Sequence, residues 1–496
     1  MRSFVTGLAW SLSIVATTQA LAQTAIPLAS APSADASLNS DQQTAIDRYV
    51  TAEMARQRIP GLELGIYRHG YPIYTKGYGI ADLEWQVPVG TETRMQTGSL
   101  GKQFVAAAIL RLAEQGKVDI DASITRYFPE APQSWRPIKV ANLLSHTSGI
   151  GIYDAPALTE PGGPIDFHRD YSEDQLVAAT VKLPLDYPVG TDWRYNNTNY
   201  MMLGILIHRV TGKFYGDWLH DEFFAPLGMR STRVISDTDV IDRRASGYEI
   251  KGGVLKNQAW VSATFNATAD GTIYTTVEDM ARWDRALDGD AILKPASRAL
   301  MWTPFPLASG KPNSAGYGFG WFMGAVNGHR TIAHSGAWQG FTSYMIRYPD
   351  DGLTVTVFDN LDAGHARPSN IARVVAGLVS PPLMPGLKMP IADKPATASR
   401  LRAVLTRAVA GGDLSGDFDA AAGYKFDPLD AADLAASLPP GWREAPMTLV
   451  RRDGAGLGTD YQYRVGSVGN TRILETTIMP SGKLMALAVV ADPDNR

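Results

Sequence analysis

The sequence predicts an α+β fold in which helices flank an antiparallel sheet assembled from distant segments, followed by a smaller C-terminal α+β domain. Strand-like apolar runs occur within residues 62–78 and again within residues 330–360 of the 496-residue chain, with helical patterns between them. A Pro-rich stretch then separates the C-terminal residues from this region. The predicted units are a large domain at residues 41–377, a linker at 378–397 and an accessory domain at 398–496.

The composition is that of a folded protein without a strong electrostatic bias. Of the residues, 45% are hydrophobic and 19% are charged, and the formal net charge is −4. This balance gives no basic excess for binding nucleic acid or anionic lipid, so the expected partner is a small-molecule or peptide substrate. The sequence contains no cysteine, which excludes disulfides, thiolate metal sites and a cysteine nucleophile.

The N-terminus has the pattern of an export signal. An apolar stretch from Phe4 to Ala16 follows a short basic start, and Ala20 and Ala22 are the small residues that a signal peptidase reads. The apolar stretch is too short to span a bilayer. We predict a signal peptide at residues 1–22, a flexible leader at 23–40, and a periplasmic or secreted mature chain without an integral membrane segment.

The large domain is expected to begin with a helix and a hairpin. Apolar residues from Ala45 to Met54 recur at helical spacing. Two strand-like runs follow, Leu62–Tyr67 and Tyr71–Tyr78, with a Gly-containing turn between them. Residues 99–116 form the next predicted helix, because their apolar residues recur at i, i+3, i+4 and i+7 and a glycine ends the run.

The later elements follow the same rules. An apolar helix is expected from about Met202 to Val210. Strands are expected at Arg330–Ala333, Phe341–Tyr348 and Thr354–Asn360, with turns at Gly336 and at Asp351-Gly352. The C-terminal domain is expected to contain a helix at Ala398–Ala410 and strands at Met447–Arg452, Asp460–Gly466, Arg472–Met479 and Leu484–Val490.

Ser99 and Lys102 form a candidate nucleophile and base. Ser99 lies at the predicted start of a helix, where its backbone N–H has no intrahelical partner and faces the positive end of the helix dipole. Lys102 is one turn further on and on the same face. Burial would lower the pKa of this lysine enough for it to accept the serine proton. A simple helix start with a solvated lysine is the alternative, but no other serine has a lysine three residues later.

Two further segments contain residues suited to the same chemistry. Tyr195 precedes an apolar helix, where a phenol can point into a cleft, and the Asn197 amide can both donate to and accept from a substrate. Gly336 permits close approach of the backbone, so the N–H of Ala337 could join that of Ser99 in an oxyanion hole. Taken singly, Tyr195 and His334 are compatible with ordinary structural roles.

Together these segments resemble the serine β-lactamase and penicillin-binding superfamily, whose signature is Ser-x-x-Lys, a Ser- or Tyr-containing loop, and Lys-Thr-Gly. The Tyr-x-Asn motif is similar to that of the class C β-lactamase branch, which includes D-Ala-D-Ala carboxypeptidases, D-aminopeptidases and carboxylesterases. The flanking segments 95–99, 143–150 and 195–200 also look like that branch. The resemblance covers roughly residues 41–377 and implies a β-lactamase/transpeptidase-like fold that includes an all-helical subdomain.

The resemblance also implies a role for each motif residue. Ser99 would be the nucleophile, and Lys102 and Tyr195 would be the general base pair, with the division of work between them left open. His334 would steer protons or a substrate carboxylate. Asn197, Ser335 and Gly336 would contact the substrate, and the backbone N–H groups of Ser99 and Ala337 would form the oxyanion hole. His146 would be structural.

One departure from the class C pattern affects the expected substrate. His334 stands where class C β-lactamases usually have a lysine, and a neutral imidazole binds a β-lactam carboxylate less well than an ammonium does. We therefore expect hydrolysis of carboxylic esters or D-amino-acid peptides, with a class C-like β-lactamase as the alternative. A penicillin- or peptidoglycan-binding protein that is acylated without turnover is a second alternative.

Other hydrolase types do not match the sequence. The histidines are scattered without a His-Glu-x-x-His pattern, so neither a metal nor another cofactor is expected. Thr97 replaces the first glycine of the Gly-x-Ser-x-Gly elbow, which disfavours an α/β-hydrolase with a Ser-His-Asp triad.

Overall fold

A computed structural model describes most of the chain. The described residues are 37–154, 165–251, 253–313, 315–384, 393, 395–418, 434–454, 459–467, 470–479 and 481–491. The predicted signal peptide at residues 1–22 lies outside the described residues, as does the predicted leader up to residue 36. In the described part of the chain, no helix is long and apolar enough to cross a membrane.

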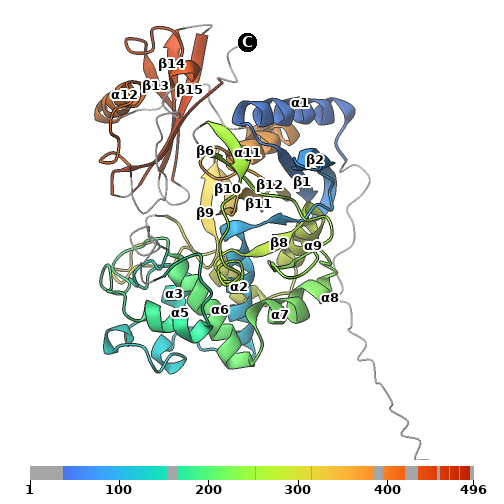
Figure 1. Cartoon of the computed structure of the whole chain (residues 1–496), viewed down its shortest axis with the longest axis vertical. Coiled ribbons are helices and arrows are strands. Elements are labelled where there is room, and N and C mark those ends of the chain that lie inside the picture. The colour runs from blue at the N-terminus through green and yellow to red at the C-terminus, as the bar shows by residue number, and fades with distance from the viewer. Residues whose placement is uncertain are drawn as a thin grey trace, which may run out of the picture.

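A seven-stranded antiparallel sheet forms the centre of the large domain (Figure 1). Its strand order is β3-β2-β1-β12-β11-β10-β9. The strands are β1 (Gly61–Arg68), β2 (Tyr71–Asp82), β3 (Val87–Pro88), β9 (Phe322–Val326), β10 (His329–Trp338), β11 (Phe341–Tyr348) and β12 (Leu353–Asp359). Leu62 of β1 pairs with Asp359 of β12, so the first and last strands of the domain meet inside the sheet. The predicted assembly from distant segments is confirmed.

The predicted turn at Gly336 is wrong. Strand β10 continues through this residue to Trp338, and the reversal occurs at Gln339 and Gly340, whose φ angles are 45° and 76°. Gly336 is needed inside the strand because a Cβ atom there would lie 1.9 Å from the carbonyl oxygen of Thr97. The glycine thus allows the segment before the predicted nucleophile to pack directly on the sheet.

Helices cover both faces of this sheet. Helices α1 (Ser40–Gln57) and α11 (Pro368–Val379) pack on one face, with α11 against β11 and β12. On the other face lie α9 (Val277–Asp288) and the segment formed by the 3₁₀ turn η2 (Gly98–Gly101) and α2 (Lys102–Glu114). The helix predicted at 99–116 is therefore divided, and Ser99 lies in its tighter first turn.

A helical region extends from α2 away from the sheet. It contains α3 (Val140–Leu144), α5 (Glu173–Thr180), α6 (Asn197–Thr211), α7 (Tyr215–Leu219), the π-helical turn η5 (His220–Phe224) and α8 (Ala225–Leu227). Helix α6 contacts α2, α3, α5 and α7, which makes it the central helix of this region. The apolar residues of α2 and α6 belong to one continuous core cluster.

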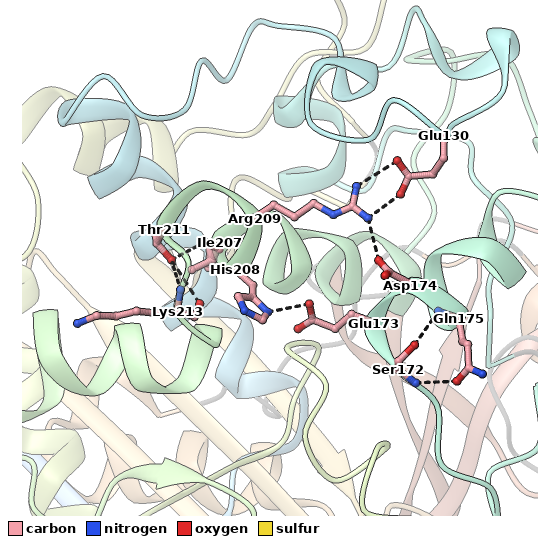
Figure 2. Close-up of polar contacts among 10 residues, drawn as sticks. All are labelled: Glu130, Ser172, Glu173, Asp174, Gln175, Ile207, His208, Arg209, Thr211 and Lys213. Atoms are coloured by element: carbon pink, nitrogen blue, oxygen red, sulfur yellow. Dashed lines mark hydrogen bonds and ion pairs between the residues drawn. The ribbon is translucent and has the colours of Figure 1, made fainter.

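Polar contacts fix the C-terminal end of α6 (Figure 2). The Nδ1 atom of His208 lies 2.8 Å from a carboxylate oxygen of Glu173 on α5. Arg209 binds both carboxylate oxygens of Glu130, at 2.6 and 3.1 Å, and also lies 3.5 Å from Asp174. The Arg209 pairs are exposed and the His208 pair is half-buried, so each adds little stability. They hold the C-terminal end of a helix whose first residue is Asn197.

The remaining short elements surround the sheet. They are β4 (Met95–Gln96), β5 (Arg233–Val234) and β8 (Ile273–Thr275) in one small sheet, β6 (Tyr248–Lys251) and β7 (Val254–Asn257) in a hairpin, helix α10 (Pro295–Met301), and the 3₁₀ turns η3 (Ile124–Arg126), η4 (Gln133–Trp135) and η6 (Pro381–Leu383). Strand β4 pairs with β8 and leads directly into η2. This small sheet therefore holds the backbone that precedes Ser99.

The C-terminal residues form a separate four-stranded antiparallel sheet, drawn in red in Figure 1, with its own core. The order is β13 (Met447–Gly454), β14 (Thr459–Ser467), β15 (Asn470–Ile478) and β16 (Leu484–Ala491), and α12 (Pro395–Val409) packs on it. The segment predicted as a linker is shorter than expected, because α11 extends to Val379 and α12 begins at Pro395. The side chain of Asn370 on α11 donates to Glu475 on β15 and so joins the two units.

We predict that Gly336→Ala destabilises the large domain. The added Cβ would overlap the Thr97 carbonyl, and relieving that overlap should lower the free energy of unfolding by about 1–3 kcal/mol. Urea denaturation followed by tryptophan fluorescence measures this change. Gly289→Ala is the matched control, because a Cβ there has no atom within 4 Å. Equal stability of the two variants would contradict the proposed packing constraint.

Candidate active site

Ser99 lies where η2 meets strand β10. A Cβ atom on Gly98, whose φ is 51°, would lie 2.2 Å from the backbone nitrogen of Ala337. The Ser343 hydroxyl donates to the Thr97 carbonyl at 2.5 Å and ties the same segment to β11. The backbone of Ala337 is thus held next to the residue that precedes Ser99. This is the arrangement in which the N–H groups of Ser99 and Ala337 could serve one oxyanion.

Lys102 connects the segments of the site. It is fully buried, and its Nζ donates to the Ser99 Oγ at 2.9 Å and to the Asn197 Oδ1 at 2.8 Å. A third bond goes to the backbone carbonyl of Asp270. All three Nζ donors therefore have acceptors, which fixes the side chain beside the Ser99 hydroxyl.

Burial of Lys102 lowers its pKa from 10.5 to about 8. The carboxylates of Asp270 and Asp154 oppose this shift, because a negative charge favours the ammonium form. A substantial fraction of the lysine is therefore neutral slightly above neutral pH. In that form it can accept the proton of the Ser99 hydroxyl 2.9 Å away.

Tyr195 faces the same hydroxyl. Burial raises the pKa of Tyr195 well above its ordinary value, and the nearby Ser99 hydroxyl partly opposes that shift. No hydrogen bond of ordinary geometry joins the Tyr195 hydroxyl to any described residue, although this oxygen is buried. The Lys102 Nζ lies 4.9 Å from the centre of the Tyr195 ring. Tyr195 is thus a neutral phenol whose hydroxyl is available to Ser99 or to a substrate.

His146 lies behind Tyr195 and supports it. The ring centroids of the two residues are 4.5 Å apart. Burial lowers the pKa of His146 well below its ordinary value, so the ring is neutral. Its Nδ1 accepts from the backbone N–H of Asn196 at 3.3 Å, which fixes the backbone between Tyr195 and Asn197. These contacts agree with the structural role expected for His146.

Asn197 joins Lys102 to a carboxylate that the sequence did not single out. The Asn197 Nδ2 donates to an Asp154 carboxylate oxygen at 2.7 Å, while its Oδ1 accepts from Lys102. Burial raises the pKa of Asp154 to about 6, and the bond from Asn197 opposes that shift. No known motif marks Asp154; its only sequence signal is its position after the His146–Ile150 segment, so it could not be predicted without the fold.

His334 is buried and uncharged. Burial, followed by the charge of Lys102, lowers the pKa of His334 to about 3. Its Nδ1 lies 2.6 Å from the Ser335 carbonyl and its Nε2 lies 3.2 Å from the Tyr317 hydroxyl. A carbonyl can only accept, so Nδ1 carries the proton and Nε2 accepts from Tyr317. In this state His334 supplies no positive charge for a substrate carboxylate. Of the two roles expected for it, steering protons and steering a carboxylate, the neutral ring fits only the first.

The edge of β10 beyond His334 is open. Pairing with β9 ends at Ala333, and the side chains of Ser335 and Ala337 are exposed while Gly336 is buried. The structure thus brings Ser99, Lys102, Tyr195, Asn197 and His334 to one site, with Ser335, Gly336 and Ala337 along its border. The described residues contain no group of three or more His, Cys, Asp or Glu side chains that could hold a metal ion.

Comparison with known proteins identifies the family. The Beta-lactamase family model matches residues 46–379. The chain belongs to the beta-lactamase family. Penicillin-binding protein 4* of Bacillus subtilis (strain 168) is 28% identical over 302 residues, which are 58% of this chain and 65% of that protein. Protein flp of Staphylococcus aureus (strain MW2) is 26% identical over 339 residues, 66% of this chain and 64% of that protein. The match thus spans less than two thirds of either relative.

Solved structures of other proteins agree in fold. The octameric penicillin-binding protein homologue from Pyrococcus abyssi superposes with a TM-score of 0.61 at 20% identity, covering 91% of this chain and 98% of that one. D-amino acid amidase from Ochrobactrum anthropi SV3 gives a TM-score of 0.55 at 26% identity, covering 65% and 91%. The predicted resemblance and the predicted β-lactamase/transpeptidase-like α+β fold are both confirmed.

We predict that the reactivity of Ser99 rises with pH through a midpoint near 8. We expect the neutral form of Lys102 to be the base, so deprotonation above its pKa of about 8 should increase the reactive fraction, and protonation at lower pH should remove it. The measurement is the rate of Ser99 labelling by a fluorophosphonate across pH 5–10.

Lys102→Arg keeps a charge that does not titrate in this range and should slow labelling by about 10²–10⁴-fold. Lys139→Arg, at a half-exposed lysine that pairs with Asp121, is the matched control. A flat pH profile in the native chain would show that Lys102 is not the base.

Proposed function

We propose that this chain is an exported serine hydrolase that acts on ester or amide substrates through a Ser99 acyl-enzyme. The observation that supports this most directly is the buried Lys102 ammonium, whose pKa is lowered to about 8, at 2.9 Å from the Ser99 hydroxyl. A buried lysine with a lowered pKa beside a serine is what proton abstraction from that serine requires.

The contacts suggest the order of proton transfers. Neutral Lys102 takes the Ser99 proton while Oγ attacks the substrate carbonyl, and the N–H groups of Ser99 and Ala337 stabilise the resulting oxyanion. The phenol of Tyr195, uncharged at neutral pH, passes the proton to the leaving alcohol or amine as the carbonyl reforms. Water then attacks the Ser99 ester and gives a proton to the base. The base passes this proton to the leaving Ser99 Oγ as the acid is released. Lys102 is the principal base in this proposal, and Tyr195 is the donor.

The charge state of His334 favours substrates without a β-lactam-type carboxylate. This imidazole is neutral because burial lowers its pKa to about 3. Carboxylic esters and D-amino-acid amides need no cation at that position, and neither does a D-peptide that is cut away from its C-terminal residue. The likeness to D-amino acid amidase at 26% identity supports the second group. A class C-like β-lactamase is the alternative, since the family is the same.

The second alternative is a penicillin- or peptidoglycan-binding protein that is acylated but does not turn over. One relative has the name penicillin-binding protein 4*. Both functions need the same Ser99, Lys102 and Tyr195. They differ in the deacylation step, which burst kinetics resolve: a hydrolase continues to release product after the first equivalent.

We predict Ser99-dependent turnover in a panel of a p-nitrophenyl ester, a D-Ala-D-Ala peptide and a chromogenic cephalosporin. The ester or the peptide should give the higher kcat/KM, and Ser99→Ala should lower it by at least about 10⁴-fold because the nucleophile is removed. Ser309→Ala, at an exposed serine, is the control. One equivalent of product without turnover would favour the binding protein, and activity retained in Ser99→Ala would refute the nucleophile.

Export is the remaining part of the proposal and depends on the N-terminal sequence. We predict that the mature protein begins at Gln23, because Ala20 and Ala22 occupy the positions read by signal peptidase. The measurement is N-terminal sequencing of the protein from the periplasm or medium of an expressing bacterium. Retention of residues 1–22 on a cytoplasmic product would contradict it.

A further inference from the structure

A cavity of about 70 Å³ lies between the large domain and the C-terminal domain. Its walls come from the start of α11 on one side and from the C-terminal sheet on the other, which stand next to each other in Figure 1. About 10–15 Å³ of such space is enough for one water molecule, so the cavity can hold several waters or a small ion. Helix α11 and η2 pack on opposite faces of the large sheet, so this cavity is separate from the Ser99 site.

The wall formed by the C-terminal sheet contains a row of side chains in register. Arg451 of β13 pairs with Gln462 of β14, Gln462 pairs with Glu475 of β15, and Glu475 pairs with Ala488 of β16. Residues directly opposite on neighbouring strands share one face of a sheet, and all four line the cavity beside α11. The apolar core of this domain lies between the sheet and α12. The row is therefore a polar strip outside that core.

Helix α11 presents a matching set of polar side chains. Ser369, Asn370 and Arg373 line the cavity, and residues three or four positions apart lie on one face of a helix. The Asn370 side chain donates to one carboxylate oxygen of Glu475, and Gln462 donates to the other at 2.9 Å. The Glu475 carboxylate is thus held by two neutral amides, one from each domain.

The charged groups that line the cavity are mainly positive. Among the described residues they are the guanidinium groups of Arg367, Arg373 and Arg451 and the carboxylate of Glu475. Arg373 and Arg451 have only 7% and 8% of their surface exposed, and arginine keeps its charge when it is buried. Like charges with little access to water repel each other strongly. One carboxylate does not balance three guanidinium groups, so an additional anion in the cavity would be favourable.

The charged residues of the neighbouring helix α1 do not remove this excess. Burial raises the pKa of Glu475, while Arg56 opposes that shift and Glu53 adds to it. Glu53 and Arg56 pair with each other at 2.6 Å, so their charges largely cancel at the cavity. The positive excess of the cavity walls therefore remains.

Neutral donors are also available in the walls. Ser369, Thr476 and Thr477 contribute hydroxyl groups. Ser369 is the second residue of α11, where backbone N–H groups have no intrahelical acceptor. Guanidinium groups, hydroxyls and the first N–H groups of a helix are the donors with which proteins bind phosphate and similar oxyanions.

We propose that this cavity binds a small oxyanion of the phosphate class between the two domains, with Arg373 on one side and Arg451 on the other. The ion accepts hydrogen bonds from both guanidinium groups and supplies the negative charge that the walls lack. Because it touches both domains, its binding stabilises the contact that Asn370 and Glu475 already make. The site does not involve Ser99, so the inference is independent of the proposed hydrolase.

The experiment measures binding of inorganic phosphate to the full chain. Sodium phosphate should raise the Tm by about 2 °C or more relative to sodium chloride at the same pH and ionic strength, because an ion that binds the folded state stabilises it. Isothermal titration calorimetry gives the Kd for phosphate. Arg373→Gln and Arg451→Gln should each weaken binding by about tenfold or more, because each removes a charge-assisted donor.

Arg452→Gln is the matched control. Arg452 is the next residue of β13 but its side chain is exposed, so this variant should bind phosphate as the native chain does. The quantity compared is the effect of phosphate on each variant rather than its Tm, so a modest loss of stability does not obscure the result. If one cavity variant does not fold, the other still gives the comparison.

Two results would overturn the inference. One is a native chain that phosphate stabilises no more than chloride does, which would leave only water in the cavity. The other is equal phosphate binding by the native chain and by the cavity variants. A phosphate monoester, glycerol phosphate, identifies the source of the anion. Equal affinity for both compounds indicates a phosphate group on a larger molecule, whereas preference for inorganic phosphate indicates the free ion, and either result supports the proposed site.

Discussion

The buried ammonium of Lys102 is the interaction on which the rest of the site depends. Its three donors bind Ser99, Asn197 and the carbonyl of Asp270, which come from three separate segments of the chain. A lysine is seldom fully buried, and burial without partners would be strongly unfavourable. The same contacts that make the burial tolerable place the amine next to the serine hydroxyl. Stability of the site and reactivity of Ser99 thus have one origin.

The architecture supplies those contacts from two layers. The sheet provides β10, against which the backbone before Ser99 packs closely enough that Gly336 cannot have a side chain. The helical region provides α6, whose first residue is Asn197 and whose far end is fixed by Arg209 and His208. Neither layer contains a complete set of reacting groups, so the site exists only where the two meet.

The sequence predicted much of this because its signals are local. Strands such as Phe341–Tyr348 have clear apolar runs, so the sheet could be predicted from the sequence. The three motifs have fixed spacings, so the family and the motif residues could be predicted as well. The turn predicted at Gly336 is wrong, whereas the close backbone approach predicted for the same glycine is present between distant segments. Glycine permits both, and the local sequence does not decide between them. Asp154 was missed for a related reason: its relation to Asn197 is a contact across 43 residues that no spacing encodes.

The charge states in the site account for its proposed selectivity. Burial keeps His334 neutral, so this residue does not supply the positive charge that binding of a substrate carboxylate would need. The proposed reaction at Ser99, by contrast, depends on a lysine that loses its proton near neutral pH. The most direct test is an NMR titration of the protein labelled with ¹³Cε-lysine, with the Lys102 signal assigned by its loss in Lys102→Arg. The account predicts a midpoint near 8, and a midpoint near the ordinary 10.5 would contradict it.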